Sequence, residues 1–187
     1  MNKAHLEYCG GPEWADTVKR YVIPWVTGGI DLGTHLLEVG PGPGLTTDVL
    51  RAMVPKLTAV EIDEDLAAAL ERRMAGTNVV TVNADATALP FDDNHFDSAI
   101  CLTMLHHVPD AATQDQLFRE LARVVKPGGP IIGSDSLHTP ELRDFHEGDT
   151  YVPVPPEGLA ERLAGLGMTD VEVETNRFSL KFVARAT

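Results

Sequence analysis

A glycine-rich turn between two apolar segments is the part of this sequence best suited to chemistry. Residues 38–44 read EVGPGPG and follow the apolar residues Leu36 and Leu37. A second apolar segment ends at Val60 and is followed at once by Glu61. A strand, a glycine turn, a helix and a second strand ending on a carboxylate form the arrangement that binds an adenosine-containing cofactor in a doubly wound sheet.

The spacing of the glycines narrows the class of cofactor. A dinucleotide fingerprint has the form G-x-G-x-x-G, and several of its backbone N–H groups face a pyrophosphate. Here Gly44 comes one residue early, and Leu45 stands where the packing glycine would be. Pro41 and Pro43 remove two more N–H donors. The turn therefore suits a cofactor whose nearby group is not a pyrophosphate, which disfavours a nicotinamide-dependent oxidoreductase.

At this turn the chain resembles the class I S-adenosylmethionine-dependent methyltransferases, whose first motif reads E-x-G-x-G-x-G. Five further segments resemble the same family in order: residues 83–86, 89–91, 96–101, 105–110 and 121–129. The segments between 89 and 110 are similar to the small-molecule methyltransferases related to ubiquinone and menaquinone biosynthesis. The resemblance covers residues 36–135 and implies methyl transfer to a small-molecule acceptor. Whether oxygen, nitrogen or carbon accepts the methyl group stays open.

The resemblance also implies a cofactor, S-adenosylmethionine, with S-adenosylhomocysteine as the product. In that family the glycine turn lies against the methionine part, the acid matching Glu61 holds the ribose hydroxyls, and the acid matching Asp85 accepts from the adenine amine. The cofactor-binding residues expected on this basis are Glu38, Gly40, Gly42, Gly44, Glu61, Ile62, Asp85 and Ala86. The alternative function is a regulatory or interaction module that binds S-adenosylmethionine without transferring methyl.

Two of the three acids in this set, Glu38 and Asp85, also have structural interpretations. Glu38 could accept from the cofactor's ammonium group or, more plausibly, brace its own glycine turn by accepting from backbone N–H groups. A carboxylate ending an apolar strand is costly without a partner, which favours the binding role for Glu61. For Asp85, a turn-forming aspartate after a strand is the alternative.

His106 and His107 are the candidate catalytic residues. A sulfonium methyl is already activated, so the reaction mainly needs a positioned acceptor. Where the acceptor must lose a proton, a histidine near its usual pKa would serve as base. Both follow the fourth expected strand, at the edge of the sheet where ligands bind, and at most one should face the site. The alternative interpretation is that both histidines are structural, and we favour it over the catalytic one.

Two segments outside the core should determine the acceptor. Residues 1–30 are expected to form a helical segment that covers the cofactor. The alternative is that the aromatic side chains of this segment simply pack on the sheet. Residues 136–158 are a long proline-containing connection of the kind that often binds substrate, although a solvated connector is equally compatible. The substrate candidates in these segments are Tyr8, His138, His146 and Tyr151.

We expect no metal. His138, His146, Glu147 and Asp149 could supply ligands, but they form no compact pattern such as H-E-x-x-H. The two cysteines are too few for a disulfide framework or for thiol-based chemistry.

The charge of the chain limits its partners. Fifteen basic and 28 acidic residues give a formal charge of −13, and no basic patch is evident, so nucleic acid is not an expected partner. No apolar run reaches the length of a membrane span, and the first residues lack a signal-peptide core. We therefore expect a cytoplasmic protein without a membrane partner. The sequence carries no signal for an oligomeric state.

Helices and strands alternate along the chain. Asp63 should cap a helix that presents Leu66, Leu70 and Met74 and ends at Gly76. A helix after Gly44 should present Leu45, Val49 and Met53, and another should present Leu117, Leu121 and Val125. Alternation of Val171 with Val173, and of Phe178 with Leu180 and Phe182, indicates a terminal antiparallel pair.

This order predicts an α/β fold: a doubly wound, mostly parallel seven-stranded sheet with a C-terminal antiparallel strand pair. We expect a single methyltransferase domain over residues 1–187. Within it, residues 1–30 form the N-terminal helical cover, 36–135 the cofactor-binding core, 136–158 the substrate loop, and 159–187 the C-terminal helix and strand pair.

Overall fold

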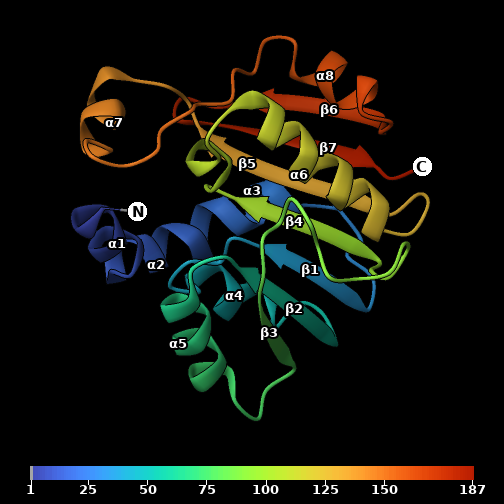
Figure 1. Ribbon diagram of the computed structural model, residues 1–187, viewed down its shortest axis with the longest axis horizontal. Helices are drawn as coiled ribbons and strands as arrows, with labels where there is room; N and C mark the ends of the chain where they lie inside the picture. Colours follow the sequence, from blue (N-terminus) through green and yellow to red (C-terminus); the bar gives the residue numbers. More distant parts are fainter. Residues whose placement is uncertain (1) are drawn as a thin grey trace.

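The computed structural model describes residues 2–187, which form one seven-stranded sheet with helices on both faces (Figure 1). The strands are β1 His35–Val39, β2 Lys56–Glu61, β3 Val79–Asn83, β4 Ser98–Leu102, β5 Pro130–Ser136, β6 Thr169–Thr175 and β7 Ser179–Arg185. Their order in the sheet is β3-β2-β1-β4-β5-β7-β6. β7 pairs antiparallel with both β5 and β6, and the other neighbours are parallel. The predicted fold class is confirmed.

The helices divide between the two faces of the sheet. They are α1 Lys3–Cys9, α2 Pro12–Thr17, the π-helical turn η1 Val18–Val22, α3 Ile23–Thr27, α4 Leu45–Leu50, α5 Glu64–Met74, the 3₁₀ turn η2 Leu105–His107, α6 Ala111–Val124, α7 Pro140–Phe145 and α8 Leu159–Gly165. One apolar core packs α6 and α8 against the sheet, and a second packs η1, α3, α4 and α5 against its other face. None of the helices in residues 2–187 combines the length and apolar character needed to cross a membrane.

The local signals for two helices are confirmed. The Asp63 side chain accepts a hydrogen bond from the backbone N–H of Leu66 at 3.0 Å, which caps α5 as predicted. α6 buries Leu117 and Leu121, and it ends at Val124, one residue before the predicted Val125.

Two predicted apolar faces are wrong in detail. α4 ends at Leu50 and buries Thr46, Thr47 and Leu50, while Met53 lies beyond the helix with 45% of its surface exposed. The reason is that the two threonine hydroxyls bond to the buried Glu38, which turns their side of the helix inward. Phe178 precedes β7 and is 69% exposed, whereas Leu180 and Phe182 of β7 are buried as expected.

The sheet order places a binding crevice at one edge. β1 pairs with β2 on one side and with β4 on the other, so the chain changes direction between these strands. In open α/β sheets, ligands bind outside the carboxyl ends of the strands at such a switch point. α1 and α7, which lie far apart in sequence, stand side by side at this edge (Figure 1).

Candidate active site

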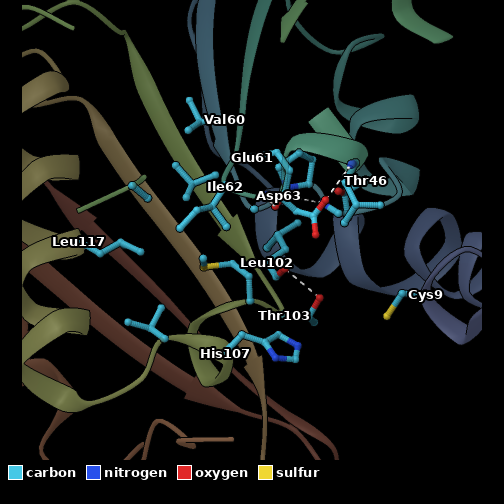
Figure 2. A pocket seen from close by; sticks show the side chains of 18 of the residues that line it. Cys9, Thr46, Val60, Glu61, Ile62, Asp63, Leu102, Thr103, His107 and Leu117 are labelled. Carbon is cyan, nitrogen blue, oxygen red and sulfur yellow. Dashed lines mark hydrogen bonds between the residues drawn. The ribbon is translucent and has the colours of Figure 1, made fainter. Parts of the chain in front are cut away.

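A cavity of about 450 Å³ lies at the carboxyl ends of the central strands. Its wall comes from the segments that follow β1, β2, β3 and β4, together with single side chains from the N-terminal helices and the loop after α7. Figure 2 shows Glu61 and Thr46 toward one end of this cavity and His107 toward the other, with Leu102 and Thr103 between them. Four strand ends therefore meet in one hollow, as the predicted fold requires.

The glycine turn after β1 has a backbone that other residues would not adopt without strain. Gly40, Gly42 and Gly44 have φ of 68°, 54° and 81°. A Cβ at Gly40 would lie 2.9 Å from Met104 Cγ, and one at Gly44 would lie 2.4 Å from Leu70 Cδ1. Gly40 and Gly42 line the cavity, whereas Gly44 packs against α5 and does not. The third glycine of the motif thus serves the contact between turn and helix.

Arg73 of α5 fixes the far side of the same turn. Its guanidinium donates to the carbonyl oxygens of Pro43 and Gly44 at 2.8 and 2.9 Å, and to the carboxylate of Asp48 at 2.6 Å. A planar guanidinium can hold several acceptors in one geometry, so the turn is held in place without a ligand. Arg73 is a residue of this site that was not selected from the sequence.

Glu61 is buried at the end of β2 and faces the glycine turn. Its Oε2 accepts from the backbone N–H of Gly42 at 2.8 Å, and its Oε1 accepts from that of Asp63 at 3.1 Å. It also lines the cavity. A carboxylate oxygen can accept more than one hydrogen bond, so Glu61 keeps acceptor capacity on the cavity side while it orders the turn.

Glu38 is a brace and not a cavity residue. Its two oxygens accept from the hydroxyls of Thr46 at 2.5 Å and Thr47 at 2.7 Å, and it is absent from the cavity wall. The favoured bracing role is therefore seen, with α4 hydroxyls as partners instead of N–H groups of the turn, and the cofactor contact stays a prediction. Burial raises the pKa of Glu38 to about 7, although the two threonine hydroxyls act in the opposite direction.

The remaining cofactor candidates belong to the wall of the same cavity. Ile62, Asp85 and Ala86 all line the cavity, from the segments that follow β2 and β3. Asp85 also makes the alternative interaction, because its Oδ1 accepts from the backbone N–H and the hydroxyl of Thr87, both at 2.8 Å. The turn-forming role and a place in the cavity wall are thus combined in one side chain.

His106 and His107 point to different places, as adjacent residues should. His107 lines the cavity, whereas His106 is a buried residue that lines a second, neighbouring cavity. His106 Nδ1 lies 2.5 Å from Asp135 Oδ1. A catalytic histidine was expected to have a pKa near the usual value. Burial, followed by the neighbouring His106 and His5, instead holds the pKa of His107 well below its usual range.

The four substrate candidates do not gather in this cavity. Tyr8 lines a neighbouring cavity of about 550 Å³ with Trp14 and Trp25, and His138 and Tyr151 line another on the outer side of α7. His146 is buried between these two. The residues of the cover segments that do line the first cavity are Cys9, Trp14, Asp149 and Thr150. None of them was among the substrate candidates predicted from the sequence.

Three comparisons with known proteins agree with this geometry. The family model described as a methyltransferase domain matches residues 37–133. The ubiquinone/menaquinone biosynthesis C-methyltransferase of Pseudomonas putida is 33% identical over 122 residues, which cover 61% of this chain and 45% of that protein. The ubiquinone biosynthesis O-methyltransferase of Pseudomonas fluorescens is 28% identical over 172 residues, covering 80% of this chain and 72% of that one.

A solved structure supports the fold independently. A crystal structure described as a SAM-dependent methyltransferase from Aquifex aeolicus superposes with a TM-score of 0.78 at 17% identity, and the match covers the whole of both chains. The chain spans less than half the length of the Pseudomonas putida relative. The family model nevertheless covers more than half of the chain, from β1 into β5. The chain belongs to the methyltransferase domain family.

Proposed function

We propose that this protein is an S-adenosylmethionine-dependent methyltransferase that acts on a small-molecule acceptor. The observation that carries the proposal is the joint position of the glycine turn, Glu61 and Asp85 around one cavity at the switch point of the sheet. Family membership supports the same conclusion.

The proposed binding mode follows the shape of the cavity. Gly40 and Gly42 lie against the methionine part, because a turn without side chains allows close approach and Pro41 leaves few N–H donors for a phosphate. Glu61 accepts from the ribose hydroxyls, and Asp85 accepts from the adenine amine through the oxygen that Thr87 does not hold. Ile62 and Ala86 supply apolar contact to the adenine ring.

We infer that the single domain has the predicted division of labour. Residues 1–30 and 136–158 cover a core at 36–135, because Trp14 and Thr150 reach the cavity from these outer segments. Methyl transfer from a sulfonium relies mainly on alignment of the acceptor, which such a cover provides. His107 lines this cavity and His106 lines the neighbouring one, so the hypothesis that at most one of them acts as a base stays open for both.

The acceptor itself stays unidentified. The neighbouring cavity shares Cys9, Trp14 and Thr103 with the first, so an acceptor bound there would lie next to the cofactor. The absence of nucleic-acid and membrane partners and a cytoplasmic location remain predictions from composition.

The proposal is tested by incubating the protein with methyl-labelled S-adenosylmethionine and a metabolite extract. We expect S-adenosylhomocysteine to form together with a labelled small molecule, which mass spectrometry identifies. Tight binding of the cofactor with no product in any extract would favour the non-catalytic module. Calorimetric binding of NAD in preference to S-adenosylmethionine would refute the cofactor assignment.

A further inference from the structure

Four histidine rings meet at the junction of α1, η2 and α7, beside the cofactor cavity. They are His5, His106, His107 and His146, and one ring nitrogen of each lies within 4.8 Å of the others. Three of the four residues are almost fully buried, with exposed fractions of 6%, 3% and 2% for His5, His106 and His146. Four histidines from three separate segments therefore share one buried space.

The nitrogens that face this space lack hydrogen-bond partners among the described residues. They are His5 Nδ1, His106 Nε2, both ring nitrogens of His107, and His146 Nε2. A buried polar atom left without a partner costs about 1–3 kcal/mol, and native structures contain few of them. The Asp149 carboxylate lies 3.8 Å from His5 Nδ1 and 3.7 Å from His107 Nδ1, which is beyond hydrogen-bond distance. Five such nitrogens at one point, with one carboxylate near two of them, indicate a site for a bound species.

The far sides of two rings fix which nitrogen is available. His106 Nδ1 lies 2.5 Å from Asp135 Oδ1, and His146 Nδ1 lies 2.6 Å from the carbonyl oxygen of Leu142. Both partners can only accept, which assigns the proton to each Nδ1 and leaves each Nε2 as the atom of the ring that can bind a metal ion. A carboxylate or carbonyl behind the ring is the arrangement that orients metal-binding histidines.

The spacing of the rings fits one small cation. With bonds of about 2.0–2.1 Å, tetrahedral coordination places four imidazole centroids roughly 5 Å apart. The centroids of the four rings are 4.3 to 6.1 Å apart. The ligand nitrogens lie within 4.8 Å of one another and need to close by up to about 1.5 Å, because in such a site they are roughly 3.3 Å apart.

We propose that His5, His106, His107 and His146 bind one divalent first-row transition-metal ion, with zinc as the fitting ion. Imidazole nitrogen suits zinc, copper, iron and nickel, and four protein ligands make a closed, structural site. This proposal departs from the expectation of no metal. That expectation considered His146 with its sequence neighbours, whereas the chain brings His146 against His5 and the pair after β4.

The ion would tie the cover to the core. Asn2 already joins the two outer segments, because its Nδ2 donates to the carbonyl oxygens of Phe145 and Glu147 at 2.9 and 3.3 Å. His5 and His146 belong to these segments, whereas His106 and His107 belong to the segment after β4 that reaches the cavity. A nitrogen of His107 that binds the ion cannot act as a base, so the two hypotheses for that nitrogen exclude each other.

The test uses the full chain without a polyhistidine tag, stripped with a chelator and titrated with zinc ions. We expect one zinc per chain by elemental analysis, a rise in melting temperature with zinc, and the visible spectrum of four-coordinate cobalt after loading with cobalt(II). Zinc well below one per chain, or a six-coordinate cobalt spectrum, overturns the proposal. A buried water that bridges the rings would give the same failure to bind.

Variants locate the ion independently of activity. We expect zinc affinity to fall at least tenfold in His5→Gln and in His146→Gln, and about 10- to 100-fold in Asp135→Asn, which removes the carboxylate behind His106. His95→Gln is the matched control, because His95 is exposed and packs with His35 and Phe91 outside the cluster. Equal zinc affinity in the parent and in His146→Gln, or equal loss in the His95→Gln control, contradicts the assignment. Circular dichroism of each metal-free variant checks that the variant is folded. If one variant does not fold, the zinc stoichiometry of the parent protein still tests the proposal.

Discussion

Replacement of Glu61 by glutamine tests the most specific part of the proposed binding mode. The carboxylate accepts from two backbone N–H groups, of Gly42 and Asp63, and lines the cavity. The amide of glutamine has the same shape but only one accepting atom, so either orientation turns an NH₂ group toward one of the two N–H donors. One backbone N–H donor therefore loses its acceptor, and the ribose hydroxyls lose an ionised carboxylate as their acceptor.

The size of both effects follows from these contacts. A hydrogen bond to a charged group contributes about 1.5–3 kcal/mol, which corresponds to roughly 10- to 150-fold in affinity for S-adenosylmethionine. The unpaired N–H group should cost about 1–3 kcal/mol of folding stability. Isothermal titration calorimetry measures the first quantity, and urea unfolding measures the second.

A neighbouring acid supplies the control. Glu64 is exposed in the first turn of α5 and does not line the cavity, so Glu64→Gln makes the same change in charge without touching the turn. We expect Glu64→Gln to bind S-adenosylmethionine as the parent does. If a folded Glu61→Gln protein also binds with the parent's affinity, the reasoning about the ribose contact is refuted.

Three further predictions concern the same site. Gly44→Ala should lose about 1–3 kcal/mol more folding stability than Gly76→Ala, as measured by urea unfolding. Both glycines have left-handed backbone, but only a Cβ at Gly44 would meet other atoms, so equal losses would contradict this explanation. Glu38 has a pKa of about 7 in the folded protein, against an ordinary value of 4.5, so the folded protein retains a proton that the unfolded chain releases between these pH values. The free energy of unfolding should therefore fall by about 3 kcal/mol as the pH rises across that range. Glu38→Gln should flatten this dependence in unfolding experiments at about pH 5 and about pH 8, and an unchanged slope would assign it to other groups. Asp85→Asn should weaken S-adenosylmethionine binding about 3- to 10-fold in calorimetry while retaining the turn through Thr87, and unchanged affinity would leave Asp85 only its turn role.

Most of the fold and the main cavity could be predicted from the sequence, because local signals fixed them. The glycine turn, the acid that ends β2 and the Asp63 cap each depend on residues close together in the chain. The doubly wound order of strands then brings the ends of β1, β2 and β4 together without further information. For these reasons Glu61 and Asp85 were found in the cavity wall, where the resemblance placed them.

The errors arose where side-chain direction or long-range packing decides. Thr46 and Thr47 face inward because their hydroxyls bond to the buried Glu38, and this helical phase was predicted wrongly from the apolar residues of the helix. A cover was predicted, but the residues by which it contributes to the cavity were not, because Asp149 and Thr150 reach the cavity through the docking of α1 on α7.

The histidine cluster is the clearest case of a feature beyond sequence reasoning. His5 and His146 lie at opposite ends of the chain, and no motif links them with the pair after β4. A search for metal sites by sequence spacing has no access to such a group. The anchoring of His106 by Asp135 could have raised interest in one ring, but not in four.

A crystal structure of the protein with S-adenosylhomocysteine bound tests the central claim most directly. The account predicts the ribose hydroxyls within hydrogen-bonding distance of Glu61, the adenine amine at Asp85, and the homocysteine part against Gly40 and Gly42. A ligand bound elsewhere, or one bound in the cavity with its ribose away from Glu61, would contradict the account.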